Sequence, residues 1–131
     1  MKILLAEDHA QMRAKLKRYL ELKGHQVVEA RDGKEAFTLI TNGDERFDAI
    51  LAGLSRTGMN GTNPLHAIGS HGHCPPTLLH SAEKRGYMDT GNGREQVDLH
   101  EFVSYFDFAR FALKSGNPVE YIGDFLDSIS T

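Results

Sequence analysis

The chain is poor in cysteine, proline and tryptophan, since its 131 residues include one cysteine, four prolines and no tryptophan. The single cysteine, Cys74, cannot form an internal disulfide, so we expect a reducing, cytoplasmic environment. No apolar run approaches the roughly 20 residues that a membrane-spanning helix needs. The first residues read as a strand and not as a signal peptide. Together these features predict a soluble protein without a membrane partner.

The sequence also lacks an excess of basic charge. Lysine and arginine total 15, and aspartate and glutamate total 18, which gives a formal net charge of −3. A nonspecific nucleic-acid binder needs a basic surface, so we expect no nucleic-acid partner. Hydrophobic residues make up 40% of the chain, the usage of an ordinary globular protein. The length is that of one domain, and we expect residues 1–131 to form a single domain.

Strand and helix signals alternate along the first half of the chain. The short apolar run at residues 3–6 is typical of a strand that is buried on both faces, and residues 26–30 and 47–52 are predicted to form the next two strands. Residues 9–23 repeat apolar side chains at helical spacing, and Gly24 suits the position that follows a helix end. These signals predict three strands, with a helix between the first two.

A second helix is predicted between the second and third strands. Asp32 and Glu35, three residues apart, form a capping-box pattern at its start. We expect Gly43 to end it and its apolar face to consist of Ala36, Phe37 and Ile40. This order of strands and helices predicts a parallel sheet with helices on both faces.

The second half of the chain is less regular. Residues 77–80 are predicted to form a fourth strand, and residues 110–114 a fifth. Residues 83–96 are rich in glycine and polar side chains, so we expect an extended loop there. Apolar residues return at helical spacing over 99–106, and a last helix is predicted to begin near Pro118.

Polar residues gather where these strands end. In an open parallel sheet, sites form outside the carboxyl ends of the strands. The residues placed there are Glu7 and Asp8 after the first strand, Gly53 and Ser55 after the third, Ser81 after the fourth and Lys114 at the end of the fifth. Two carboxylates, a hydroxyl and an ammonium are therefore predicted to converge on one pocket.

At these residues the chain resembles the receiver domain of two-component response regulators, over nearly its whole length. The resemblance is carried by the segments ILLAEDH, GHQVVEARDGKEAF, FDAILAGLSRTGMNG and FALKSGNP. It implies a flavodoxin-like α/β fold, a three-layer sandwich whose five parallel strands follow the order 2-1-3-4-5. It also implies a non-enzymatic signalling domain whose partner is another signalling protein, either a histidine kinase or an output protein.

The resemblance also assigns roles to the pocket residues. In that family an acidic pair helps to bind Mg²⁺, an aspartate at the end of the third strand accepts a phosphoryl group, and a hydroxyl and a lysine hold it. The resemblance makes Glu7 and Asp8 the acidic pair, Ser81 the hydroxyl and Lys114 the lysine, with Phe111 at the aromatic switch position. Each residue also has a simpler interpretation. Glu7 and Asp8 would be acids at a helix N-terminus, Ser81 and Lys114 would be polar residues at strand ends, and Phe111 would be a core residue.

The chain departs from the family at the phosphoryl acceptor. Gly53 stands where the aspartate belongs, and Thr57, beside Arg56, stands where the family usually has proline. We therefore expect a degenerate pseudo-receiver that acts through protein–protein contacts without aspartyl phosphorylation. With one carboxylate fewer, Mg²⁺ should bind weakly, and no cofactor is required. Lys114 is then expected to bridge permanently to Asp8.

By resemblance, the contact surface comprises the helix near residues 99–106, the strand at 110–114 and the last helix. Because no output domain follows Thr131, we expect the chain either to act in trans or to be part of a longer protein. Two other functions stay open: phosphorylation on a substitute residue such as Ser55 or Asp8, and a structural interaction domain without a switch.

A third possibility is a metal-responsive module. The segment DTGNGREQVDLHEF resembles an EF-hand calcium loop through Asp89, Asn92, Asp98 and Glu101, whose oxygen atoms suit Ca²⁺. The spacing departs from that loop, so an acidic loop before a helix is the simpler interpretation. A zinc site is a further alternative, although its spacing matches no standard pattern; its residues would come from His66, His71, His73, Cys74 and His80.

Overall fold

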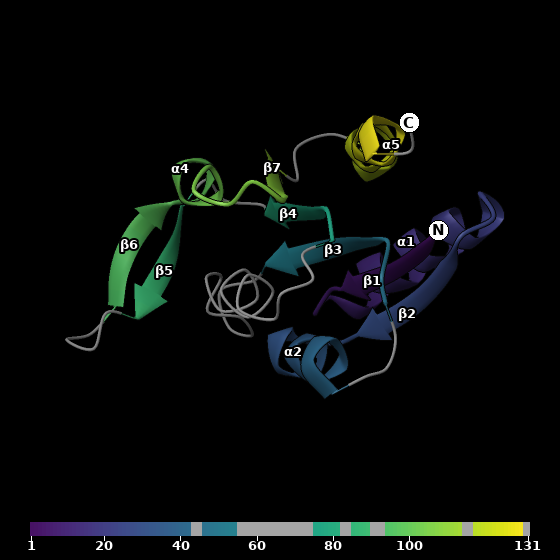
Figure 1. Cartoon of the computed structure of the whole chain (residues 1–131), viewed down its shortest axis with the longest axis horizontal. Helices are drawn as coiled ribbons and strands as arrows, with labels where there is room; N and C mark the ends of the chain where they lie inside the picture. The colour runs from purple at the N-terminus through teal and green to yellow at the C-terminus, as the bar shows by residue number, and fades with distance from the viewer. Residues whose placement is uncertain (43–45, 55–74, 82–84, 90–93, 114–116, 130–131) are drawn as a thin grey trace.

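The structure is a computed structural model that describes residues 1–42, 46–54, 75–81, 85–89, 94–113 and 117–129 (Figure 1). Its first elements are β1 (Lys2–Ala6), α1 (Ala10–Leu22), β2 (Gln26–Ala30), α2 (Gly33–Asn42) and β3 (Ala49–Leu54). The elements that follow are β4 (Thr77–Ser81), β5 (Arg85–Asp89), β6 (Arg94–Asp98), α4 (Leu99–Val103), β7 (Ala109–Leu113) and α5 (Pro118–Ile129). The alternation of strands and helices predicted for the first half is confirmed.

Five strands form one parallel sheet in the order β2-β1-β3-β4-β7. Since β5 and β6 form a separate two-stranded sheet, β7 is the fifth strand of the main sheet. The order is therefore 2-1-3-4-5, and the predicted flavodoxin-like fold is confirmed. The strand order switches between β1 and β3, so the carboxyl ends of these two strands frame the site.

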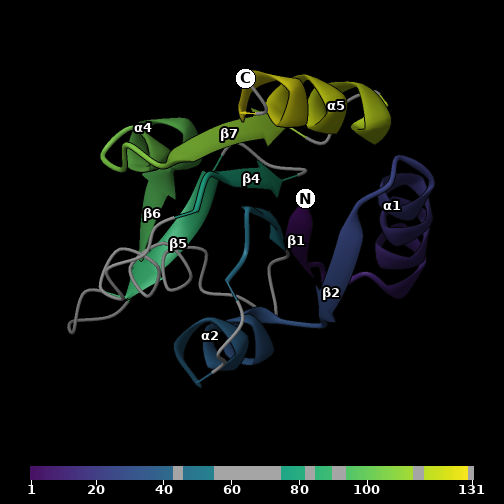
Figure 2. The ribbon, with the colours of Figure 1, turned by 45° about the vertical axis from the view of Figure 1, so that its right-hand side comes forward.

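Helices cover both faces of the main sheet (Figure 2). Successive residues of a strand point to opposite faces, so each buried strand supplies both layers of core. In β1, Ile3 and Leu5 pack beneath α1 and α5, whereas Leu4 and Ala6 pack against α2. The helix α4 packs on the α2 side, where Leu79 of β4 joins its core. The result is the three-layer sandwich that the resemblance implied.

The predicted helix boundaries are largely confirmed. The Glu35 N–H donates to Oδ1 of Asp32 at 2.8 Å, as the capping-box pattern predicted. Gly24 has a φ of +91°, the left-handed conformation that favours glycine after a helix end. The prediction that Phe37 lies on the buried face of α2 is wrong, because its side chain is 49% exposed. The buried stripe of α2 runs through Ala36 and Ile40, and Phe37 is rotated away from it.

The third and fifth strands of the main sheet are shifted from their predicted bounds. The third begins at Ala49 and runs to Leu54, whereas residues 47–52 were expected, so Gly53 lies within the strand. The fifth begins one residue earlier than expected, at Ala109. Ala49 pairs with Ile3 of β1, whereas Gly53, Leu54 and Ala109 pair with residues of β4, and apolar content alone does not reveal this pairing.

The prediction of an extended loop at residues 83–96 is wrong for residues 85–89 and 94–96, which the structure describes. β5 and β6 form an antiparallel hairpin with five successive pairs, from Arg85 opposite Asp98 to Asp89 opposite Arg94. Its sequence carries no alternation of apolar and polar residues, which is the signal by which a half-buried strand is predicted. The helix that follows is also shorter than expected, since α4 ends at Val103.

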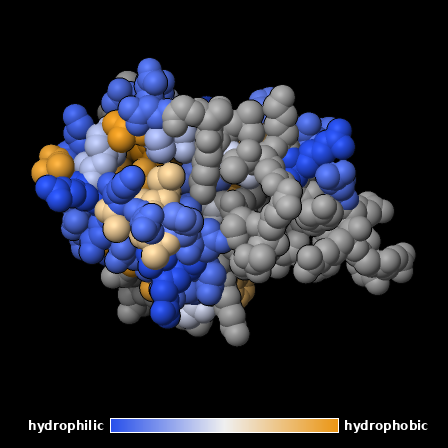
Figure 3. Space-filling model, turned by 180° about the vertical axis from the view of Figure 1, so that it is seen from behind, coloured by the Kyte–Doolittle hydropathy of each residue, from blue (hydrophilic) through white to orange (hydrophobic). Residues whose placement is uncertain are grey.

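The surface of the described residues is mostly hydrophilic when the molecule is seen from behind, with small separate apolar areas (Figure 3). In the described part of the chain, no helix combines the length and the apolar character that crossing a bilayer requires.

Candidate functional site

The predicted pocket residues lie at the carboxyl edge of the main sheet. Glu7 directly follows β1 and its side chain is completely buried, whereas Asp8 is partly exposed. Ser81 ends β4 and is also buried. Gly53 lies one residue before the end of β3. Two other predicted residues lie outside the described part of the chain: Ser55 and Lys114.

Gly53 lies in the middle of a row that crosses three strands. It pairs with His80 of β4 on one side. On the other side the last β1–β3 pair joins Ala6 to Ala52, so Glu7 follows at the level of Gly53. The row two residues earlier (Leu5, Leu51 and Leu78) belongs to the core beneath α1 and α5, so this row faces the same helices.

The carboxylate of Glu7 and the imidazole of His80 meet across this row. Oε2 of Glu7 lies 3.8 Å from Nε2 of His80, and both side chains are 0% exposed. Their strands are not neighbours, because β3 lies between them, which places the two backbones roughly 10 Å apart. Since Gly53 has no side chain, the two polar groups can reach each other over the middle strand. No side chain of β3 therefore stands in this row between the two polar groups.

Tyr121 of α5 lies on the other side of the imidazole. Its hydroxyl is 3.3 Å from Nδ1 of His80, and the two ring centroids are 5.8 Å apart. Burial, together with the charge of Glu7, raises the pKa of Tyr121 to about 12. The hydroxyl therefore keeps its proton at neutral pH and can donate it to Nδ1, while Nε2 of the same ring faces Glu7. A chain of polar contacts thus joins β1, β4 and α5.

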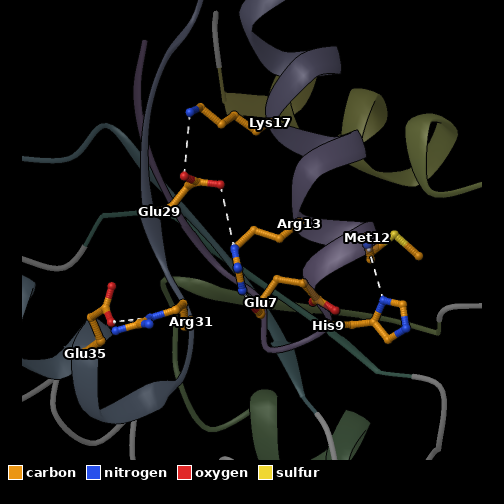
Figure 4. A network of polar contacts seen from close by, with 8 residues as sticks. All are labelled: Glu7, His9, Met12, Arg13, Lys17, Glu29, Arg31 and Glu35. Carbon is orange, nitrogen blue, oxygen red and sulfur yellow. Dashed lines mark hydrogen bonds and ion pairs between the residues drawn. The ribbon is translucent and has the colours of Figure 1, made fainter.

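The backbone of Glu7 is held from the other side by α1 and β2 (Figure 4). The Glu7 N–H donates to the carbonyl of Ala30 at 3.0 Å, and a guanidinium N–H of Arg13 donates to the Glu7 carbonyl at 2.8 Å. Arg13 also lies 3.7 Å from a carboxylate oxygen of Glu29, and Lys17 lies 3.6 Å from the other oxygen. These contacts fix the main chain of Glu7 while its side chain turns toward His80.

Sequence reasoning missed the contacts of His80 and Tyr121. His80 was considered only as one of several possible zinc ligands, and Tyr121 was not singled out at all. A signal was nevertheless present in the sequence. His80 follows Leu78 and Leu79 in the strand that was predicted at residues 77–80. A histidine at a buried strand position needs a polar partner, and Glu7, at the end of the first strand, is a polar residue at the same edge of the sheet.

The predicted aromatic switch residue, Phe111, packs in the core beside α4. It pairs with Leu79 in the sheet and joins the cluster that contains Leu99 and Val103. Its ring meets that of His100 edge-on, with centroids 6.2 Å apart and an interplanar angle of 83°. This packing matches the simpler interpretation of Phe111, and its role as a switch stays a prediction.

Among the residues that the structure describes, the side chains around Gly53 offer few oxygen ligands for Mg²⁺. This ion prefers six oxygen ligands in octahedral geometry and is held in proteins by carboxylates. Gly53 supplies no side-chain oxygen, and the Glu7 carboxylate already has an imidazole nitrogen at 3.8 Å. Asp8, the other member of the predicted acidic pair, is partly exposed.

The structure does not bring the predicted calcium ligands together. Asp89 and Asp98 lie at opposite ends of the hairpin, which separates their backbones by about four residues or roughly 14 Å. The Asp98 carboxylate accepts the N–H of Glu101 at 3.0 Å, so it caps α4. Asn92 lies outside the described residues.

The zinc candidates cannot be placed as a group either. Four of them lie outside the described residues, namely His66, His71, His73 and Cys74, while His80 is in the main sheet. Within the described part of the chain, His, Cys, Asp and Glu side chains form no group of three or more that could hold a metal ion.

Comparison with known protein sequences identifies the family. The sequence model of the response regulator receiver domain matches residues 3–104. The transcriptional regulatory protein CpxR of Escherichia coli strain K12 is 32% identical to this chain over 78 residues. The match covers 60% of this chain and 32% of CpxR, so the chain spans about a third of the length of this curated relative.

Solved structures share the fold over almost the whole chain. The chemotaxis protein CheY4 of Vibrio cholerae superimposes with a TM-score of 0.72 at 22% identity, covering 98% of this chain and 97% of that one. The receiver domain of the sensor histidine kinase PA1611 from Pseudomonas aeruginosa PAO1, solved with a magnesium ion in its active site cleft, gives a TM-score of 0.72 at 18% identity. That alignment covers 99% of this chain and 98% of the other. Since the family match extends over most of the sequence, the chain belongs to the response regulator receiver domain family.

Proposed function

We propose that this receiver domain signals through protein–protein contacts without aspartyl phosphorylation, as a degenerate receiver of a two-component system. The observation that carries the proposal is the row of Glu7, Gly53 and His80. Gly53 offers no nucleophile at the acceptor position, and the contact between Glu7 and His80 at 3.8 Å lies across it. The pocket therefore lacks the carboxylate that would take the phosphoryl group, and a buried polar contact lies in the row of the acceptor position.

The charges of the pocket support the same proposal. A receiver that accepts a phosphoryl group on aspartate needs Mg²⁺ to neutralise its carboxylates, and a magnesium ion lies in the cleft of the Pseudomonas relative. Here the imidazole of His80 lies 3.8 Å from the Glu7 carboxylate, on the side where a cation would otherwise approach it. We propose that Mg²⁺ binds this pocket weakly and that no cofactor is required.

The surface through which the domain signals is proposed to be the face of α4, β7 and α5. Two of the large apolar side chains exposed in the structure belong to this part of the chain. Tyr105, in the turn after α4, is 76% exposed, and Val119, in the first turn of α5, is 37% exposed. The partner is proposed to be a histidine kinase or an output protein, since receiver domains act by contacting proteins of these kinds.

Intact-mass spectrometry after incubation with acetyl phosphate and Mg²⁺ tests the proposal. A receiver domain that has an aspartate at the acceptor position should gain the mass of one phosphoryl group, and this chain should not. The matched variant is Gly53→Asp combined with His80→Val, which supplies the carboxylate and removes the imidazole that faces Glu7. We expect this double variant to gain the phosphoryl group. A gain by the unmodified chain would overturn the proposal, and mapping it to Asp8 or Ser55 would identify a substitute acceptor.

A further inference from the structure

The hairpin of β5 and β6 stands apart from the main sheet (Figures 1 and 2). Among the described strands, each of the two pairs only with the other. A two-stranded hairpin is marginally stable in water on its own, whereas three or more strands form a sturdier sheet. Its outer edges also carry the backbone N–H and C=O groups that a further strand could pair with. The hairpin is therefore a candidate surface for adding strands from another molecule.

The two strands share one pattern of charge. β5 has the sequence RGYMD and β6 has the sequence REQVD, so each begins with arginine and ends with aspartate. Within the hairpin this pattern sets Arg85 opposite Asp98 and Asp89 opposite Arg94. The same pattern makes each strand complementary to a second copy of itself in antiparallel orientation. A parallel arrangement would instead set like charges opposite each other, which is unfavourable.

The position of the hairpin favours β6 as the pairing edge. In Figure 1 β6 lies on the outer side of the hairpin, with α4 at its end, and β5 lies between it and the main sheet. An approaching strand can thus reach β6 without meeting the main sheet. On β6 the side chains of Gln96 and Asp98 are exposed.

We propose that two copies of this chain associate by antiparallel pairing of their β6 strands, about a two-fold axis that passes beside Gln96. Arg94 of each copy then stands opposite Asp98 of the other, and Gln96 stands opposite its own counterpart. The two hairpins join into one four-stranded sheet. Because the same surface serves both copies, the assembly closes as a dimer. This inference does not depend on whether the domain is phosphorylated.

Disulfide trapping at the two-fold axis tests the register. Residues directly opposite each other in antiparallel strands have Cβ atoms about 4.5–5.5 Å apart, close enough for a disulfide after a small adjustment. With Cys74→Ser to remove the native thiol, Gln96→Cys should give a covalent dimer under mild oxidation. The matched controls are Tyr87→Cys, at the centre of β5, and Gln26→Cys, on the edge strand β2 of the main sheet. Both should remain mostly monomeric.

Each result of the trapping experiment decides the matter. A covalent dimer that forms at Gln96 and not at the two control positions supports the proposal. Trapping that is strongest at Tyr87 would assign the interface to β5 and overturn it. Equal trapping at all three positions would show random collision, which overturns it as well, and so would the absence of trapping at Gln96.

Sedimentation equilibrium of the unmodified chain and two charge variants provides an independent test. Arg94→Ser removes the cation from both sides of the interface, whereas Asp89→Ser removes only a partner within the hairpin. The two lost Arg94–Asp98 pairs should raise the dimer dissociation constant about 2- to 30-fold in Arg94→Ser and leave it unchanged in Asp89→Ser. At about 1 mM protein, even a dimer with a millimolar dissociation constant is detectable. If the unmodified chain is monomeric at that concentration, the proposal is overturned. Equal weakening by the two variants would overturn it too.

Discussion

The main sheet and the β5–β6 hairpin show two ways in which strands form in one chain. The strands of the main sheet are parallel, and the residues at their centres, such as Leu5, Leu51 and Leu79, are completely buried. The hairpin is antiparallel, and of its side chains those of Arg85, Gln96 and Asp98 are exposed. Burial of apolar surface drives the first arrangement, whereas backbone pairing holds the second, in which residues of opposite charge are opposite in register.

Charged and polar groups differ between the two regions in the same way. In the hairpin, Arg85 and Asp98 are opposite in register and both are exposed, and an ion pair in contact with water contributes roughly 0–1 kcal/mol. In the pocket, Glu7 and His80 meet without access to water, where loss of one partner leaves the other buried. Removing one partner of a polar contact should therefore lower the free energy of unfolding much more in the buried pocket than in the exposed hairpin.

The largest expected effect comes from the core of the main sheet. Leu51→Ala should lower the free energy of unfolding by about 4 kcal/mol, because its completely buried side chain leaves a cavity. The hairpin substitution Gln96→Ala should change it by less than about 0.5 kcal/mol. Urea unfolding at low protein concentration measures both. A large loss in the Gln96 variant would show that the hairpin is part of the folding core and would remove the contrast between the regions.

A smaller but still large effect is expected at the buried polar contact. His80→Leu should destabilise the protein by about 3 kcal/mol, because the Glu7 carboxylate then stays buried without its imidazole. Adding Glu7→Leu should recover most of this loss, since two apolar groups then replace the two polar ones. Arg85→Leu in the hairpin is the control and should change stability by less than about 1 kcal/mol.

This double variant also separates two explanations of the His80 effect. If His80 mattered only by filling space, His80→Leu would cost little and the second change would recover nothing. The coupling between the two substitutions in a double-mutant cycle measures the polar contact itself.

The contrast between the regions also explains how far the sequence could predict them. The strands of the main sheet were predicted because short apolar runs such as residues 3–6 are typical of strands that are buried on both faces of a sheet. The hairpin was predicted as a loop, because strands such as β6, with exposed Gln96 and Asp98, carry no such run. The pairing of β5 with β6 depends on which residues stand opposite each other across the turn. The periodicity of apolar residues within one segment does not show this register.

The pocket was predicted in part for a similar reason. Glu7, Asp8 and Ser81 were placed correctly at the strand ends, because each follows or ends an apolar run. The contact between Glu7 and His80 was missed, since it depends on the register of three strands and on the missing side chain of Gly53. The Tyr121 contact was missed because it joins residues from β4 and α5, 41 positions apart.

Tyr121→Phe should have a smaller effect at neutral pH. It removes the hydroxyl that lies 3.3 Å from Nδ1 of His80 but keeps the ring in place. The expected loss is about 1 kcal/mol, the usual contribution of one hydrogen bond. Tyr105→Phe, in which the ring is 76% exposed, should leave stability unchanged. Urea unfolding of the two variants compares them, and equal stabilities would show that the contact with His80 contributes nothing.

The smallest effect concerns high pH, where the same hydroxyl should make folding sensitive to alkali. The pKa of Tyr121 is raised to about 12 in the folded chain by burial and by the charge of Glu7, against about 10 in an unfolded chain. The unfolded state therefore loses this proton first, so the contribution of Tyr121 to stability is fully present below pH 10 and is lost as the pH rises toward 12. Urea unfolding between pH 9 and pH 11 should show a decline that is shallower in Tyr121→Phe than in Tyr105→Phe. Parallel declines in the two variants would place the ionisation of Tyr121 outside the buried network of Glu7 and His80.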